Sequence, residues 1–259
     1  MSRLRARCPA CETLTVVAVS SRYECHVCGH VFAAGLVRVP RAWGVGGEAM
    51  ADAAALELPY PETGSIEEDT LAAQSLALAA ALPERPLVLG GCCCAHIGAV
   101  EGLSVRRDGP LAVVWLDAHG DLNTPESSPS GNLWGMPLRM LLDDGAVAPG
   151  NVALIGARNL DQPEEEFIAT SGLRVGAEGV AAALEGAERV YVALDCDSLD
   201  PSAIACFMPE SGGLSLEAAE QVLREVAARA AVVGVGVTGL LPDPANVAPV
   251  ARLLAALGL

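Results

Sequence analysis

Short apolar runs that alternate with helical segments constrain the fold of this chain most strongly. The runs are rich in valine and leucine, end at or near Gly or Asp, and lie at 86–89, 111–116, 151–155, 189–194 and 232–237. Segments of helical character lie at 69–82, 97–103, 136–143, 163–170, 216–230 and 249–257. Parallel strands need long crossover connections, which are usually helices. The alternation therefore predicts an α/β fold, in which a parallel sheet is covered by helices on both faces.

The composition excludes several classes of protein. Hydrophobic residues make up 52% of the 259 residues, which is incompatible with a disordered chain. The chain has 16 Lys and Arg against 32 Asp and Glu, a formal net charge of −16, and has no basic stretch. Because binding to a phosphate backbone depends on Lys and Arg, we expect no nucleic-acid partner.

The apolar runs and the cysteines indicate in which cellular compartment the protein is expected. No run approaches the roughly 20 apolar residues that a membrane-spanning helix needs. The N-terminus has no apolar stretch of the kind found in a secretory signal. The chain has nine cysteines, which without an export signal favour metal or thiol chemistry in a reducing compartment. We therefore expect a cytoplasmic protein that is not associated with a membrane.

Two Cys-x-x-Cys motifs lie near the N-terminus. They are formed by Cys8, Cys11, Cys25 and Cys28. Each motif places two thiolates on one tight turn, and two such turns can close a tetrahedral site for a structural Zn²⁺. Unmetallated thiols and a rubredoxin-like iron site are the alternatives. His26 and His30, beside the second motif, are expected to be solvated or to support the ligands rather than to bind the metal.

The cysteine motifs also suggest how the chain is divided. A hairpin between them, over 16–23, would give a zinc-ribbon-like segment that we place at residues 1–40. The remainder, residues 41–259, is expected to be the α/β domain. Its first part, at 41–68, is rich in Gly, Pro and Glu without a clear period and is interpreted as a connector.

Acidic motifs follow two of the predicted strands. Asp117, His119 and Asp121 follow the run at 111–116, and Asp195 and Asp197 follow the run at 189–194. Residues i and i+2 of an extended segment point to the same side, and ligands bind at the carboxyl ends of parallel strands. Either motif alone could be a surface turn, but carboxylates that converge in a buried site need cations to neutralise them. Oxygen ligands with one imidazole favour Mn²⁺ or Mg²⁺, and a pair of such ions can activate a water.

Four segments together resemble a known family. DAHGDLNTPESSPSGNLWGMP, ALDCDSLDP and PESGGLS resemble motifs of the arginase/agmatinase (ureohydrolase) family, and GGCCCAHIG resembles its first metal motif, GGDHSxxxG. The resemblance extends over residues 86–258. It implies a three-layer α/β/α fold, two Mn²⁺ ions, and hydrolysis of the C–N bond of a guanidinium or related linear amidine. It also suggests a homo-oligomer, either a trimer or a hexamer.

The resemblance assigns roles to individual positions. Five positions match metal ligands of the family: Asp117, His119, Asp121, Asp195 and Asp197. Of these, Asp121 and Asp195 would bridge the two metals, and Asp121 would be the catalytic residue that orients the bridging hydroxide. Three positions match residues on the substrate side: Asn123, Ser130 and Asp161.

Three positions depart from the family pattern. Cys93 stands where the family has a histidine ligand; a thiolate can also bind metal, but it prefers Zn²⁺ or Fe²⁺ to Mn²⁺. Trp134 replaces a histidine that is thought to shuttle protons. Gly239 replaces a glutamate that would pair with the substrate guanidinium. Because a buried guanidinium needs a carboxylate partner, Gly239 argues against arginine as the substrate.

Two alternatives concern the residues around Cys93. His96 could replace the missing histidine ligand only if the loop bent differently, and it is expected to be a residue of the first turn of a helix. The triplet of cysteines at 92–94 could be redox-active, although no partner pattern supports this.

The sequence thus predicts a metal-dependent hydrolase of a linear amidine or guanidino C–N bond, with a small-molecule substrate other than arginine. A binding or regulatory protein that keeps the fold without efficient chemistry is the alternative, with the ribbon as its interaction module. A zinc-ribbon protein that binds nucleic acid disagrees with the net charge of −16.

Overall fold

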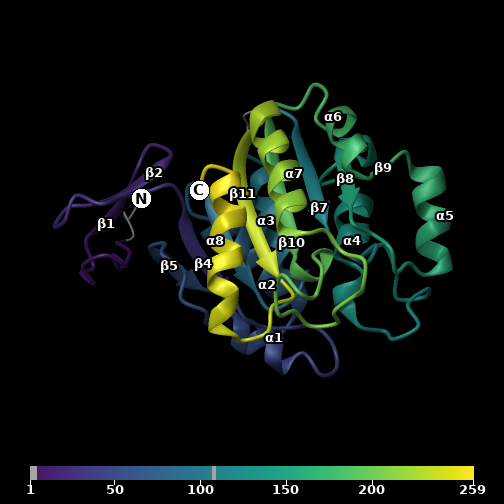
Figure 1. Cartoon of the computed structure of the whole chain (residues 1–259), viewed down its shortest axis with the longest axis horizontal. Helices are drawn as coiled ribbons and strands as arrows, with labels where there is room; N and C mark the ends of the chain where they lie inside the picture. The colour runs from purple at the N-terminus through teal and green to yellow at the C-terminus, as the bar shows by residue number, and fades with distance from the viewer. Residues whose placement is uncertain (1–4, 107–108) are drawn as a thin grey trace.

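The chain forms a large α/β body and a small ribbon at one end, as seen in a computed structural model that describes residues 5–106 and 109–259 (Figure 1). The strands of the large body are β4 (Gly35–Val39), β5 (Glu62–Ser65), β6 (Pro86–Gly90), β7 (Leu111–Leu116), β8 (Val152–Ile155), β9 (Arg174–Val175), β10 (Arg189–Asp195) and β11 (Ala231–Thr238). The helices are α1 (Glu48–Ala53), α2 (Leu71–Ala81), α3 (Ala95–Ser104), α4 (Pro137–Asp143), α5 (Gln162–Ser171), α6 (Val180–Ala183), α7 (Leu216–Arg229) and α8 (Val247–Ala256).

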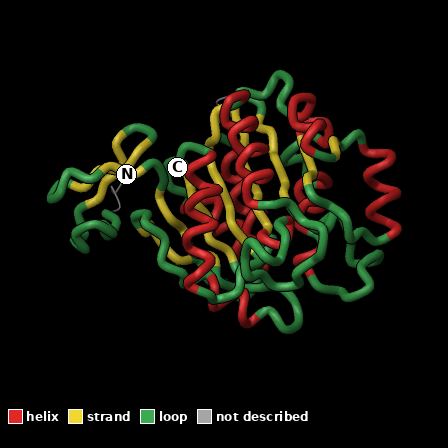
Figure 2. Tube along the Cα trace, in the orientation of Figure 1, coloured by secondary structure: helices red, strands yellow, loops and turns green. Residues whose placement is uncertain are grey.

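The large sheet has eight strands in the order β5-β4-β6-β11-β10-β7-β8-β9. All of its strand pairs are parallel, because each strand is followed by a connection that returns the chain to the same edge. The tube drawing shows helices in front of and behind the sheet (Figure 2). The predicted three-layer α/β/α architecture is therefore confirmed, and each of the predicted apolar runs and helical segments forms a strand or a helix.

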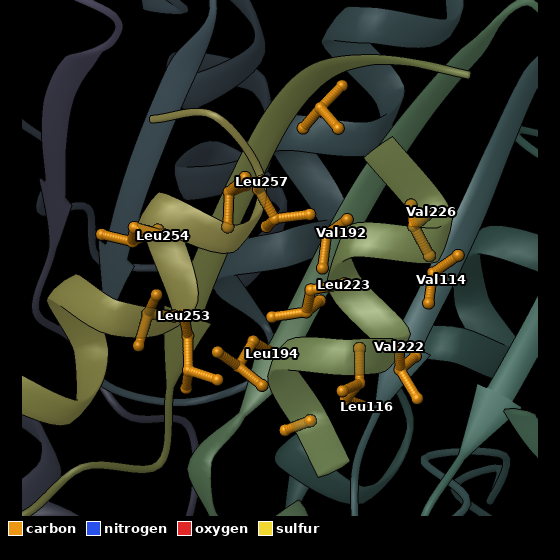
Figure 3. Packing of buried hydrophobic residues seen from close by; sticks show 14 of the residues in the cluster. Val114, Leu116, Val192, Leu194, Val222, Leu223, Val226, Leu253, Leu254 and Leu257 are labelled. Carbon is orange, nitrogen blue, oxygen red and sulfur yellow. The ribbon is translucent and has the colours of Figure 1, made fainter. Parts of the chain in front are cut away.

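Each face of the sheet supports its own core. On one face, helices α7 and α8 direct residues such as Leu223 and Leu254 toward Leu194 and its neighbours on the central strands (Figure 3). On the other face, side chains of α2, α3 and α4 belong to a second buried cluster that includes Trp115 and Tyr191. Both faces of the central strands are thus apolar, as expected of a buried parallel sheet.

The interpretation of residues 41–68 as a connector was wrong in part. This stretch contains helix α1 and strand β5, and β5 pairs with β4 at the edge of the sheet. The sequence of β5, Glu-Thr-Gly-Ser, is not apolar because an edge strand is only partly buried. Hydrophobic periodicity therefore gave no signal for it.

The ribbon has its own antiparallel sheet, which consists of β1 (Val16–Val19), β2 (Arg22–Cys25) and β3 (Val31–Phe32). It lies next to β4 and β5 (Figure 1). The Tyr23 hydroxyl donates a hydrogen bond of 2.7 Å to the Glu84 carbonyl, and the tyrosine ring packs on Gly35, where a Cβ would lie 2.7 Å from the ring. These contacts attach the ribbon to the body.

We expected the ribbon segment to extend to residue 40. The ribbon's own sheet ends at Phe32, and the next strand, β4, pairs with β5 and β6 in the large sheet. The division of the chain into domains at residue 40 stays a prediction. The first four residues of the ribbon segment lie outside the described residues. In the described ranges, no helix combines the length and the apolar character needed to cross a membrane.

Candidate metal centre

The sheet order brings together four segments that are far apart in the sequence. Strands β6, β11, β10 and β7 are neighbours at the centre of the sheet. The segments that follow their carboxyl ends carry the residues that the sequence singled out: Cys93 after β6, Asp117 after β7, Asp195 at the end of β10 and Gly239 after β11. The candidate site is therefore at the carboxyl edge of the sheet, where open α/β folds bind their ligands.

Cys93, Asp117 and Asp195 form a first group of buried donor atoms. The Cys93 Sγ lies 2.8 Å from Asp195 Oδ2 and 3.6 Å from Asp117 Oδ2. One donor atom from each residue lies within 4.8 Å of the other two, so the group could hold a metal ion. All three residues are buried, which makes an uncompensated cluster of charges costly.

Asp117, His119 and Asp197 form a second group. The His119 Nδ1 lies 3.0 Å from Asp197 Oδ2 and 3.4 Å from Asp117 Oδ1. These three residues also offer donor atoms within 4.8 Å of one another. Because Asp117 belongs to both groups, the two candidate metal positions are adjacent.

Asp121 lies outside both groups but lines the same pocket. It adopts a left-handed backbone conformation, with φ of 53°, which is unfavourable for an aspartate and typical of strain at functional sites. Among the described residues, Asp121 Oδ2 is one of the few buried side-chain atoms without a hydrogen-bond partner. A cation bound beside it would satisfy this oxygen, so the donor set fits a pair of divalent ions.

The pKa values also indicate that negative charge is in excess in the cluster. Burial raises the pKa of Asp195 to about 7 and that of Asp197 to about 6, and neighbouring carboxylates add to the effect. Burial also raises the pKa of Asp121, together with the charges of Asp117 and Asp195. For His119, burial acts in the opposite direction, but hydrogen bonds to Asp117 and Asp197 raise the pKa to about 12. The raised pKa values mean that the metal-free cluster binds protons more readily than exposed carboxylates do.

A pocket of about 260 Å³ opens above the cluster, and Asn123, Ser130 and Asp161 are among the residues that line it. Asn123 Nδ2 donates a hydrogen bond of 2.9 Å to Asp161 Oδ2. On another side, Trp134 and Phe207 meet edge to face, with ring centroids 5.8 Å apart, and form an apolar wall. The pocket therefore combines an acidic floor, a polar side and an apolar side.

Glu164 lines the same pocket and was missed in the sequence. Its Oε1 accepts a 2.9 Å hydrogen bond from the Leu122 backbone N–H, and its Oε2 accepts one of 3.0 Å from that of Asp161. It thereby joins the segment after β7 to the start of α5, where it forms a capping box with Asp161. The Asp-x-x-Glu spacing of a capping box is the signal that could have found it.

Gly239 leaves no room for a side chain. Its φ is 71°, and a Cβ would lie 2.2 Å from Asp195 Oδ1. Replacing this glycine by the glutamate of the family pattern would displace a carboxylate of the first group. The missing carboxylate therefore cannot be restored by substitution at this position alone.

The ribbon cysteines form a separate group, with one Sγ from each of the four within 4.8 Å of the others. The Cys8 and Cys28 sulfurs are 3.7 Å apart, and those of Cys11 and Cys25 are 3.6 Å apart. A tetrahedral site with Zn–S bonds of about 2.3 Å has S–S edges of about 3.8 Å, so the spacing suits a ZnS₄ site. His26 and His30 are not members of this group, as expected.

The fold and the site define an α/β protein with a candidate binuclear metal centre at the carboxyl edge of a parallel sheet. The family model described as "Arginase family" matches residues 49–257. The chain belongs to the arginase family, as the resemblance indicated. The ribbon lies outside the matched residues.

Individual relatives agree with this assignment. The chain is 39% identical to an arginase of Bacillus subtilis in an alignment of length 156 that covers 50% of this chain and 52% of that relative. It thus matches about half the length of the curated relative. A crystal structure of arginase from Bacillus subtilis superposes with a TM-score of 0.75 at 26% identity, over 86% of this chain and 97% of that one. A formimidoylglutamase from the same species shares the fold, with a TM-score of 0.70 at 19% identity over 87% and 86% of the two chains.

The substitution Gly239→Ala should damage the metal centre. A left-handed backbone costs a non-glycine residue about 1–3 kcal/mol, and the added Cβ would push Asp195 out of position. We expect a lower free energy of unfolding, measured by chemical denaturation, and weaker binding of divalent metal. Gly64→Ala is the control, because a Cβ there meets no atom within 4 Å. Unchanged metal affinity in Gly239→Ala would contradict the geometry.

The stability of the metal-free protein should fall as the pH rises from about 4 to about 7. Asp195 and Asp197 have pKa values of about 7 and 6 in the folded chain, above the usual value of about 3.9. The folded state therefore binds these protons more tightly than the unfolded state does, and this stabilisation is lost as they dissociate. Denaturation of chelator-treated protein at several pH values measures the trend. The double variant Asp195→Asn/Asp197→Asn should flatten it, and an equal slope in that variant would contradict the assignment.

Proposed function

We propose that this chain is a metal-dependent hydrolase that cleaves a C–N bond of a linear amidine or guanidino compound other than arginine. The observation that carries the proposal is the pair of donor groups that share Asp117 at the floor of a small-molecule pocket. Membership of the arginase family supports the same reaction class. We infer two divalent ions in this centre, with Mn²⁺ expected from the family pattern and other ions possible at Cys93.

The chain's own residues would divide the work. Bound divalent ions supply Lewis acidity and an activated water. Asp121, whose Oδ2 is free of hydrogen bonds among the described residues, would accept a hydrogen bond from that water and orient it toward the substrate carbon. Asn123, Ser130 and Asp161 would hold the polar end of the substrate. Trp134 and Phe207 would exclude bulk water from the reacting bond.

The proposed substrate preference follows from Gly239 and Trp134, which line the same pocket. No side chain can project from Gly239 toward a guanidinium, because Asp195 occupies the space. Trp134 places an indole where the family has an ionisable histidine. A fully charged guanidinium would lose its carboxylate partner there, so a less basic amidine or formimino group suits the pocket better.

We propose one structural Zn²⁺ in the ribbon, bound by Cys8, Cys11, Cys25 and Cys28. The four sulfurs have the spacing of a tetrahedral thiolate site. All nine cysteines are free thiols, which suits a reducing, cytoplasmic environment. A homo-oligomeric assembly is a further proposal that rests on the family resemblance.

Release of urea or ammonia from a panel of compounds tests the proposed reaction. The panel should contain arginine, agmatine, formimino compounds and amidino compounds, since a formimidoylglutamase shares this fold. With Mn²⁺ or Zn²⁺ present, we expect turnover of at least one compound other than arginine. Asp121→Asn should lower that kcat by about 10²–10⁴-fold, the usual contribution of a positioned general acid or base.

Asp69→Asn is the matched control for this assay, because its carboxylate is fully exposed and lies outside the pocket. Arginine turnover above that of all other compounds would overturn the substrate assignment. Tight binding of a panel compound without turnover would favour a binding or regulatory protein.

Elemental analysis tests the ribbon site. Protein purified without added metal should contain about one Zn²⁺ per chain in the ribbon, in addition to the ions of the acidic centre. The variant Cys25→Ser/Cys28→Ser should lose one equivalent of zinc, whereas Cys206→Ser, which changes a thiol outside the ribbon and outside both acidic groups, should retain it. One equivalent of iron in place of zinc would indicate a rubredoxin-like site, and no loss of metal would contradict the assignment.

A further inference from the structure

Cys93 gives one of the two candidate metal positions a different donor chemistry from the other. Its sulfur lies among Asp195 Oδ2 at 2.8 Å, Thr238 Oγ1 at 3.3 Å and Asp117 Oδ2 at 3.6 Å. It lies two residues before the start of helix α3, in the tight turn that follows β6, and only 5% of its surface is exposed. The first group thus offers one sulfur and carboxylate oxygens, whereas the second offers an imidazole and carboxylate oxygens.

His96 does not replace the missing histidine ligand. Its Nε2 is 3.2 Å from Thr238 Oγ1, and its Nδ1 is 3.0 Å from the Tyr191 hydroxyl. Both ring nitrogens therefore have hydrogen-bond partners inside the protein. The ring also packs against Gly236, where a Cβ would lie 2.4 Å from Nδ1. His96 is a residue of α3, as the sequence predicted, and the first group has no imidazole among the described residues.

The buried chain of hydrogen bonds around His96 instead supports the sulfur site. Thr238 Oγ1 lies 3.2 Å from Asp195 Oδ2 and 3.3 Å from the Cys93 sulfur, so it contacts both donors. Behind Thr238, His96 and Tyr191 fix the position of the hydroxyl. Hydrogen-bonded partners of this kind orient the ligands of metal sites. The position is therefore built around a sulfur and a carboxylate.

We propose that Cys93 binds metal as a thiolate and makes the position formed with Asp117 and Asp195 selective for a thiophilic divalent cation, with Zn²⁺ as the expected ion. Soft thiolates favour Zn²⁺ over Mn²⁺, whereas the oxygen and imidazole donors at the second position also suit Mn²⁺. On binding, the S–H bond breaks, a sulfur–metal bond forms and the proton passes to solvent. The centre would then hold two different metals, one at each position. This inference deepens the proposed function and rests on the same metal centre.

Cobalt spectroscopy tests the proposal without an activity measurement. Full-length protein is treated with a chelator and titrated with Co²⁺ under anaerobic conditions, as wild type and as Cys93→Ser. The ribbon cysteines are identical in both proteins, so their contribution cancels in the difference spectrum. We expect a thiolate-to-Co²⁺ charge-transfer band in the difference between wild type and Cys93→Ser. Cys94→Ser is the matched control, because its buried neighbouring thiol is not a member of the group, and it should retain the band.

Competition between Zn²⁺ and Mn²⁺ gives a second readout. Cys93→His, which restores the imidazole of the family pattern, should lower the preference for Zn²⁺ over Mn²⁺ by about tenfold or more, the scale of effects around metal ligands. If Cys93→Ser does not fold, Cys93→His replaces it in the cobalt experiment, because it also lacks the thiol that gives the charge-transfer band.

The outcomes separate this inference from the proposed function. Equal Co²⁺ binding by wild type and Cys93→Ser with no difference band would show that the thiol only donates a hydrogen bond, and would overturn the inference. An unchanged metal preference in Cys93→His would also overturn it. A clear band in a protein that hydrolyses no compound of the panel would refute the hydrolase while supporting Cys93 as a ligand.

Discussion

Mutual repulsion among buried carboxylates is the constraint on which the rest of the site depends. Asp117, Asp121, Asp195 and Asp197 are all nearly inaccessible to solvent, and they converge at one edge of the sheet. Buried charges of one sign are stable only if cations or protons neutralise them. The pKa values of Asp121, Asp195 and Asp197 are raised, so in the metal-free chain these carboxylates bind protons more readily than exposed ones do. A binuclear centre is the arrangement that resolves the repulsion without protonating the ligands.

Two glycines, one in strand β11 and one directly after it, make this convergence possible. Gly236 leaves the space that the His96 ring and the Tyr191 hydroxyl occupy, and Gly239, just beyond the strand, leaves the space for the Asp195 carboxylate. The same position carries no carboxylate that could pair with a guanidinium. The packing of Asp195 and the proposed preference for the substrate thus both depend on Gly239.

Two modules with different donor chemistry meet in this chain. The ribbon offers four sulfurs at tetrahedral spacing, and its attachment to the sheet edge depends on Tyr23. The acidic centre offers mainly oxygens, with Cys93 as a sulfur at one position. The family match covers residues 49–257, so the ribbon lies outside it.

The sequence by itself determined the central strands, the helices and most members of the candidate metal groups, because each depends on a local pattern. Apolar runs form buried strands, and alternate residues beyond their ends project to one side, which placed Asp117, His119, Asp195 and Asp197 together. The sequence did not predict the edge strand β5, because its four residues have no apolar pattern. Only the tertiary structure decided that His96 binds Thr238 and Tyr191 rather than metal, that Glu164 joins the pocket, and that Gly239 must remain glycine. These contacts join residues from different strands and helices, and their distances depend on how the whole sheet packs, which no local pattern encodes.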